Sequence, residues 1–170
     1  MLFRSGSTRK HLNDYRGSNS RLDELQAAFL RVKLTRLDAW NARRSAIAQA
    51  YLKSIDPSRF SLPVVSECSE PNWHLFVVRS SRRDADIAEF ARRGIDTAIH
   101  YPLAPPYQNA YADLCSVPRL EIATRLQNEV LSLPIGPHMP QSHVATVIAA
   151  ANAPADWRAI GEISGHAVVN

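Results

Sequence analysis

The chain has 170 residues, a formal net charge of +4 and 45% hydrophobic residues, which is ordinary for one globular domain with a buried core. No apolar run approaches the ~20 residues of a membrane helix, and the first residues lack an apolar stretch of signal-peptide length, so we expect a cytoplasmic protein without a membrane span. The basic excess is too modest to indicate nucleic acid. Cys68 and Cys115 have no metal-like spacing and are predicted to be reduced structural thiols.

Residues 1–18 are polar and basic and alone would form a mobile tail. Apolar residues at helical spacing then continue to about residue 53, and a helix of roughly 30 residues is expected to span more than its own domain or to bend. Two caps are candidates for its start, because Ser20 with Asp23 resembles a capping box and Asn19 is an alternative. The stripe consists of Leu22, Leu25, Phe29, Val32, Leu37, Trp40, Ile47 and Tyr51.

Residues 73–79 are the clearest predicted strand, and because both of their faces are largely apolar we expect cover on both sides. Ser81 with Asp84 is predicted to cap a helix that ends just before Gly94, a natural C′ residue. Residues 95–100 follow as a second strand. The order strand, helix, strand predicts one helix packed on a small sheet.

The segment 101–108 contains three prolines and is predicted to be stiff and extended. Pro118 is placed to start a helix, residues 131–135 are a third predicted strand, and Pro140 starts a helix through about residue 150. Together the elements predict a mixed α/β fold, with a small sheet of about three or four strands flanked by helices and led by one long helix.

Residues 17–28 read Gly-Ser-Asn-Ser-Arg-Leu-Asp-Glu-Leu-Gln-Ala-Ala. They resemble the G-x-N-x-R-[LM]-x-E-[LI]-Q-A-A segment of the DegT/StrS family, the pyridoxal-phosphate-dependent sugar aminotransferases. Further strings follow in the same order and with similar spacing, over roughly residues 5 to 150. They lie at residues 34–44, 73–79, 94–97, 99–102, 108–111 and 131–135.

The resemblance implies the small C-terminal domain of a fold-type I aminotransferase. Residues 1–18 would be the remnant of a connection to a large cofactor domain, residues 19–151 the small domain with its long linking helix, and residues 152–170 a divergent tail. The parent reaction would move an amino group from an amino acid, with glutamate as the expected donor, to a keto sugar on a nucleotide. The cofactor would be pyridoxal phosphate, and the most similar enzymes act on 3-keto nucleotide sugars.

Asn19 occupies the position of a family asparagine that reaches across a dimer interface to the cofactor phosphate of the other subunit. Arg21 stands at the family's arginine and is expected to help hold the same loop or anion. A dianionic phosphate prefers N–H donors and a nearby cation. On the residues alone, Asn19 can equally be a helix cap.

His100 and Tyr101 match the family's sugar-side loop, where a histidine can bond a sugar hydroxyl or the diphosphate. On the residues alone, a partly buried histidine at a strand end is the other interpretation. The histidine of the family's P-x-H-x-Q string falls on Pro106 here, so Tyr107 is the candidate substitute and Gln108 keeps the glutamine. The resemblance therefore implies a substrate site of His100, Tyr101, Tyr107 and Gln108.

Transamination needs a lysine that forms a Schiff base with the cofactor, and in the family this lysine lies upstream on the large domain. Lys10, Lys33 and Lys53 have no such context. We therefore assign no catalytic residue, and we expect this chain alone to bind no cofactor and to be inactive. Its apolar helix, with Leu22, Phe29, Leu30 and Trp40, would be exposed and would favour self-association.

Three interpretations remain open, in order of preference. The chain is a truncated part of a sugar aminotransferase; or it is half of a split enzyme that pairs with a separate large-domain chain; or the fold is reused as a binding module. The surface for the third would be the basic helix face with Arg31, Lys33, Arg36, Arg43 and Arg44, although a run of this kind is usually a solvated face without nucleic acid. In the intact enzyme a homodimer is expected.

Two other sets of polar residues are predicted to have no catalytic or metal-binding role. His138 and His143 are predicted to be loop histidines rather than metal ligands, because no third ligand lies nearby. Asp84, Asp86 and Glu89 are predicted to lie on the exposed side of a helix and to add solubility.

Overall fold

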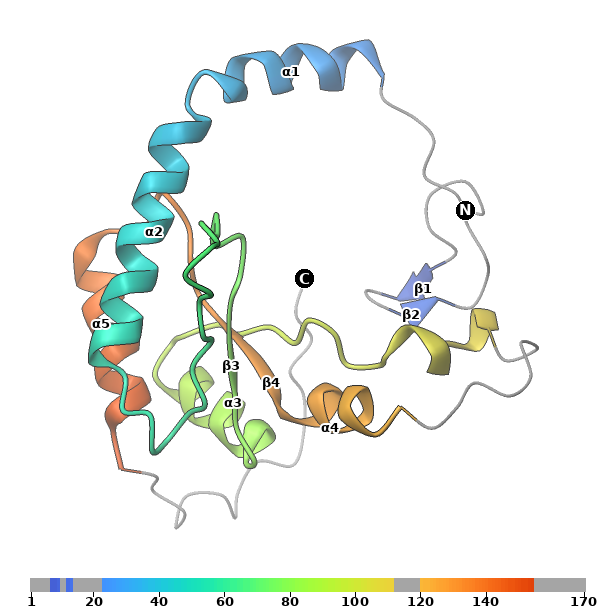
Figure 1. The fold of residues 1–170 in the computed structure, drawn as a ribbon, viewed down its shortest axis with the longest axis vertical. Helices are drawn as coiled ribbons and strands as arrows, with labels where there is room; N and C mark the ends of the chain where they lie inside the picture. The colour runs from blue at the N-terminus through green and yellow to red at the C-terminus, as the bar shows by residue number, and fades with distance from the viewer. Residues whose placement is uncertain (1–6, 10–11, 14–22, 112–119, 155–170) are drawn as a thin grey trace.

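A computed structural model describes residues 7–9, 12–13, 23–111 and 120–154 of the chain. Helices flank a small antiparallel sheet (Figure 1), which confirms the mixed fold of helices and sheet. In this part of the chain no helix is long and apolar enough to cross a membrane. In order, the elements are β1 (Ser7–Arg9), β2 (Leu12–Asn13), α1 (Glu24–Leu34), α2 (Leu37–Ser54), β3 (Phe76–Arg79), α3 (Arg83–Arg92), η1 (Pro105–Tyr107), η2 (Asn109–Tyr111), α4 (Glu121–Glu129), β4 (Val130–Leu133) and α5 (Gln141–Asn152).

The central sheet is smaller than predicted. β3 and β4 pair antiparallel over their whole lengths, and beyond them there are only single bridges, from Ser61 to Arg79 and from Ala98 to Ser132. Trp73 has a φ of 52°, which breaks the extended backbone ahead of β3 and shortens the predicted strand. The prediction of three or four strands is therefore wrong for the described residues, where two strands form this sheet and β1 and β2 pair separately.

The predicted single long helix is two helices, α1 and α2. At the junction the hydroxyl of Thr35 donates to the carbonyl of Val32 at 2.8 Å, and the N–H of Arg36 donates to the carbonyl of Lys33 at 3.0 Å. These i to i−3 bonds replace the regular helical ladder and end α1. As a result α1 stands away from the body that α2 joins (Figure 1).

The cap of α1 lies later than predicted. Asp23 accepts a hydrogen bond from the backbone N–H of Gln26 at 2.8 Å, so Asp23 is the N-cap of α1. The two predicted caps, Ser20 and Asn19, lie outside the described residues.

Each end of α3 is closed by local hydrogen bonds. Ser81 is not the cap that we predicted; instead the hydroxyl of Ser80 accepts from the N–H of Arg82 at 3.0 Å. Gly94 is confirmed as the C′ residue, with a φ of 71°. Its N–H and that of Ile95 return to carbonyls of the last turn at 2.9 Å, which is the Schellman arrangement.

The core lies between α2, α5, α3 and the sheet. The ring of Tyr51 packs edge-on against Phe76 with centroids 5.1 Å apart, and its hydroxyl donates to the carbonyl of Pro134 at 2.8 Å. Burial raises the pKa of the Tyr51 phenol, so it stays protonated in the folded chain. The largest fully buried side chains are Tyr51, Phe60, Phe76, Ile47, Leu131, Val78 and Val144.

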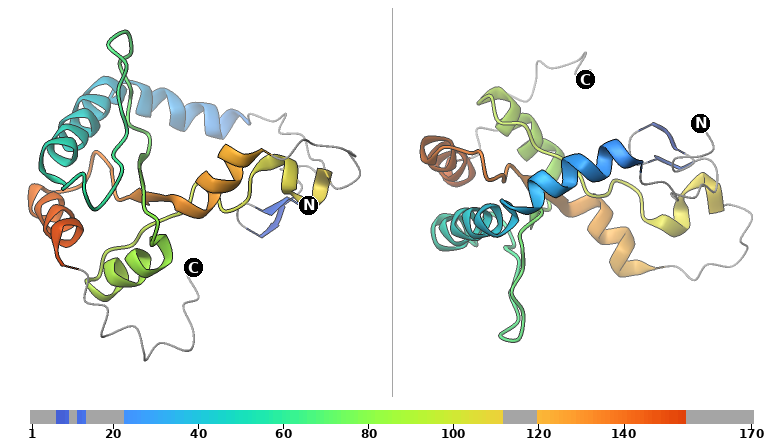
Figure 2. Two further views of the ribbon diagram at one scale, coloured as in Figure 1. Left: turned by 60° about the horizontal axis from the view of Figure 1, so that its bottom comes forward. Right: turned by 90° about the horizontal axis from the view of Figure 1, so that it is seen from above.

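α2 and α5 lie side by side, as both views in Figure 2 show. Asn152, the last residue of α5, joins their ends. Its side-chain oxygen accepts from the N–H of Asp56 at 2.8 Å, and its side-chain nitrogen donates to the carbonyl of Ser54 at 2.7 Å. One amide thus satisfies two backbone groups at the end of α2.

Asp86 is buried, which corrects the prediction that it lies on an exposed face. The hydroxyl of Ser80 donates to its carboxylate at 2.5 Å, and Arg82 and Arg59 approach at 3.5 and 3.8 Å. These partners compensate the cost of burying the charge. The prediction is also wrong for Glu89, whose side chain is only 15% exposed and whose carboxylate is bound by Arg92 and Arg93. Asp84 is exposed as predicted.

α1 has no buried residue, although much of its sequence is apolar. The predicted exposure of Phe29 and Leu30 is confirmed at 60% and 54%. Trp40 is only half-buried rather than exposed, and Leu22 lies outside the described residues. The large apolar side chains that α1 exposes are Leu25, Phe29, Leu30, Val32 and Leu34.

Candidate functional site

The segment that carries the predicted sugar-side residues follows the edge of β4. The bridge from Ala98 to Ser132 fixes its start, and Nδ1 of His100 then lies 2.9 Å from the hydroxyl of Ser132. The ring of His100 packs edge-on against Tyr101 with centroids 5.6 Å apart. Tyr101 itself is 56% exposed. The pair therefore offers one half-buried imidazole, oriented by the sheet, and one accessible phenol.

Tyr107 and Gln108 hold this segment against the rest of the fold. The hydroxyl oxygen of Tyr107 accepts from the N–H of Leu120 at 3.0 Å and from the hydroxyl of Thr124 at 3.1 Å, both at the start of α4. Gln108 is 5% exposed, and its side chain donates to the carbonyl of Leu103 at 3.2 Å. Their predicted contact with substrate stays a prediction, and the bonds described here give both residues a structural task.

The predicted cofactor residues, Asn19 and Arg21, lie outside the described residues, as does Lys10. Lys33 and Lys53 are exposed on α1 and at the end of α2, and neither lines the two cavities described next. The described residues therefore place no amine where a carbonyl cofactor could be enclosed. By themselves the described residues do not fit pyridoxal phosphate.

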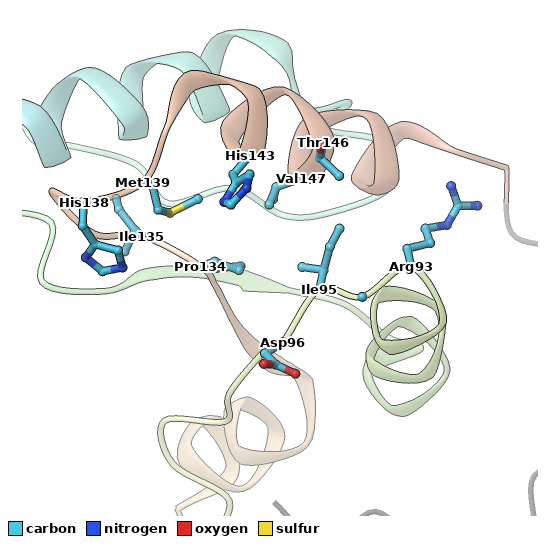
Figure 3. Close-up of a pocket in the computed structure, with 11 residues that line it drawn as sticks. Arg93, Ile95, Asp96, Pro134, Ile135, His138, Met139, His143, Thr146 and Val147 are labelled. Carbon is cyan, nitrogen blue, oxygen red and sulfur yellow. The ribbon is translucent and has the colours of Figure 1, made fainter.

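A cavity of about 630 Å³ lies between the end of α3, the turn after β4 and α5 (Figure 3). Ile95 and Val147 are among the apolar residues of its wall, and Arg93 is one of the polar residues at its rim. Figure 3 shows His138 and His143 well apart. His143 lies on α5 rather than in a loop as predicted, and the described part of the chain contains no cluster of three metal-ligating side chains.

A second cavity, of about 600 Å³, was not apparent from the sequence. It is lined by Trp40 and Arg44 of α2, by His74 and Leu75 ahead of β3, and by residues 135–138 after β4. The only available sequence signal was the spacing of four between Trp40 and Arg44, which places both on one side of a helix.

The basic residues of the first two helices do not form one surface. Arg43 donates to the carbonyl of Met139 at 2.8 Å, which fixes it against the turn before α5. Arg44 is one of the residues that line the second cavity. Of the five residues of the predicted basic face, only Arg31, Lys33 and Arg36 are exposed, which weakens the interpretation as a basic binding face.

The model of the DegT/DnrJ/EryC1/StrS aminotransferase family matches residues 2–152, and the chain belongs to this family. It is 45% identical over 153 residues to the dTDP-3-amino-3,4,6-trideoxy-alpha-D-glucose transaminase of Streptomyces venezuelae, covering 87% of this chain and 40% of that protein. It is also 45% identical over 151 residues to the erythromycin biosynthesis sensory transduction protein EryC1 of Saccharopolyspora erythraea, covering 88% and 41%.

Solved structures show the same fold. The structure of S. venezuelae DesV in complex with a ketimine intermediate superposes with a TM-score of 0.72 at 43% identity, over 89% of this chain and 42% of that one. A family aminotransferase from Brucella abortus gives a TM-score of 0.71 at 28% identity, over 88% and 40%. The chain thus spans about two fifths of the length of the relatives that it matches.

Proposed function

We propose that this chain carries the sugar-facing small domain of a nucleotide-sugar aminotransferase. The parent reaction transfers an amino group from glutamate to the keto group of a nucleotide-linked sugar, with pyridoxal phosphate as cofactor. The observation that carries this proposal is the 45% identity to a protein named as a dTDP-amino-sugar transaminase, which runs over nearly the whole chain.

In this proposal residues 19–151 are the small domain, residues 1–18 connect it to the large domain, and residues 152–170 diverge from the family. The family match supports the second boundary, because it ends at residue 152. The bonds from Asn152 to the end of α2 support the inclusion of α5 in this domain.

His100 and Tyr101 contact the sugar nucleotide in this proposal. The exposed phenol of Tyr101 and the imidazole beside it can both bond hydroxyl or diphosphate oxygens. Tyr107 and Gln108 act mainly by holding the segment in place, because the Tyr107 hydroxyl accepts two bonds at the start of α4 and the Gln108 side-chain nitrogen donates to Leu103. A loss of Tyr107 should therefore change the position of the loop rather than remove one substrate contact.

Asn19 and Arg21 reach the cofactor phosphate of a second subunit in the intact dimer, on the basis of their positions in the family motif. The lysine that binds the cofactor belongs to a separate region, either on a companion chain or elsewhere in a longer polypeptide. The exposed apolar side chains of α1 support a companion region, because a helix that is apolar on several sides is normally buried. They favour this arrangement over a free-standing binding module.

The test compares the chain alone with the chain plus a lysine-bearing domain. The purified chain, given pyridoxal phosphate, glutamate and a 3-keto nucleotide sugar, should form no amino sugar and show no visible absorbance from lysine-bound cofactor. Co-expression with the unmatched part of the S. venezuelae transaminase should restore both signals, and a lysine-to-alanine variant of that part should abolish them.

Two results would change the proposal. Amino sugar formed by the chain alone would refute the assignment of the lysine to another region. Stable co-purification without absorbance would exclude the split-enzyme arrangement and leave the interpretation as an inactive part.

A further inference from the structure

We infer that the cavity lined by Arg44 is a binding site for a small oxyanion, the carboxylate or phosphate group of a small molecule. It lies between α2, the turn before β3 and the turn after β4. It shares no residue with the segment to which the proposed function assigns the sugar, so the inference is independent of that function.

The first argument is that Arg44 lacks the acceptor that other half-buried arginines have. Its Nη1 is 3.4 Å from the side-chain oxygen of Asn41, which is a long contact. Its Nε–H is shielded from solvent and has no acceptor among the described residues. Guanidinium groups carry five N–H donors, and leaving them unsatisfied in a partly buried site costs free energy.

The comparison with the other half-buried arginines of the described chain makes this clear. Each of them reaches a carboxylate or a backbone carbonyl. The pairs are Arg43 with the carbonyl of Met139 at 2.8 Å, Arg79 with Glu129 at 2.8 Å, Arg83 with Asp84 at 2.8 Å, and Arg59 with the carbonyl of Ala153. The missing partner of Arg44 is therefore expected to be an acceptor of the same kind, and a planar guanidinium can bind the two oxygens of such a group together.

The second argument is the composition of the cavity wall. His74 and His138 supply further ring N–H donors, and no carboxylate is among the lining residues. Trp40 supplies a flat apolar surface against which the uncharged part of a ligand can pack. The volume of about 600 Å³ is in the range of small-molecule sites.

The third argument concerns the glycine at the turn after β4. A Cβ at Gly136 would come within 2.6 Å of the imidazole of His138. The glycine therefore allows the ring to lie close against the turn, at the edge of the cavity. Gly136→Ala should displace the His138 ring while every N–H donor of the site remains. This variant therefore tests whether anion binding depends on where the imidazole lies and not only on the charge of the site.

The experiment titrates the chain with inorganic phosphate and, separately, with acetate at constant ionic strength, and follows the arginine Nε–H and tryptophan indole N–H signals by NMR. We expect saturable shifts of Arg44 and Trp40. Arg44→Gln should weaken binding at least tenfold, which corresponds to about 1.4 kcal/mol. Arg36→Gln is the matched control, because Arg36 is exposed and does not line the cavity. The tighter of the two anions identifies the ligand group as phosphate or carboxylate.

Two further variants keep the test decisive if Arg44→Gln disturbs folding. Arg44→Lys keeps the charge but loses the planar fork, and both it and Gly136→Ala should bind several-fold more weakly at unchanged helicity. The inference is overturned if neither anion gives a saturable shift, if chloride gives the same shift, or if the Arg44 variants bind as the unmodified chain does.

Discussion

Tyr51 gives the prediction with the most definite sign. Its hydroxyl is buried, and burial raises the pKa of the phenol. Below pH 10, near the pKa of an unfolded tyrosine, both states carry the proton and Tyr51 adds no pH dependence. As the pH rises above that value the unfolded chain loses the proton first, so the folded state is destabilised by about 1.4 kcal/mol for each further pH unit.

Tyr51→Phe removes both this ionisation and the bond to the carbonyl of Pro134. Loss of the bond should lower the free energy of unfolding at pH 7 by about 1 kcal/mol. The two effects cancel about 0.7 pH units above the unfolded pKa, so the variant should become the more stable protein near pH 11. Urea unfolding from pH 7 to 11.5 measures the difference, in which all other ionisations cancel.

Tyr101→Phe is the matched control, because the Tyr101 side chain is 56% exposed and should show no such reversal. The reasoning is refuted if the stability difference between Tyr51→Phe and the unmodified chain is independent of pH up to 11.5. It is equally refuted if the Tyr101 variant shows the same reversal.

The remaining predictions concern four other features. Asn152→Ala should lower the free energy of unfolding by about 1–2 kcal/mol, because two bonds to the end of α2 are lost; an unchanged urea midpoint would contradict this. Gly94→Ala should cost about 1 kcal/mol through its positive φ alone, since an added Cβ meets nothing within 4 Å, and thermal melting measures it. The chain should self-associate through the exposed apolar side chains of α1. The double variant Leu25→Glu with Phe29→Glu should sediment closer to the monomer without loss of stability, because neither side chain is buried. A monomeric unmodified chain would contradict this prediction. The hydrogen bond from Arg93, and further pairing with Arg92, lower the pKa of Glu89. Ionised Glu89 therefore stabilises the folded state above about pH 4.3, and this contribution is lost as the pH falls further. In Glu89→Gln the free energy of unfolding should fall less steeply with decreasing pH.

The sequence predicted those parts of the fold that depend on local pattern. Gly94 ended α3 as expected, because its backbone conformation is a local property. The break between α1 and α2 was not located, since the apolar stripe runs on through Thr35 without proline or glycine. Asp86 looked like a surface carboxylate because its partner Arg59 is brought beside it only by the tertiary fold.

In the candidate site too, the sequence predicted what depends on local pattern and missed what depends on tertiary contacts. The motif located the segment with His100 and Tyr101, but it did not reveal that Tyr107 is bonded to α4, because that contact depends on how the helix docks. The cavity at Arg44 combines residues from three separated segments. Such a juxtaposition has no signature in a single sequence.

The pairings of β3 with β4 and of α2 with Asn152 join early and late parts of the chain. During synthesis α2 and β3 leave the ribosome long before their partners are made. Their apolar faces therefore stay exposed to solvent until residue 152 has left the exit tunnel. Nascent chains stalled short of that point should therefore engage chaperones more strongly than chains stalled well beyond it.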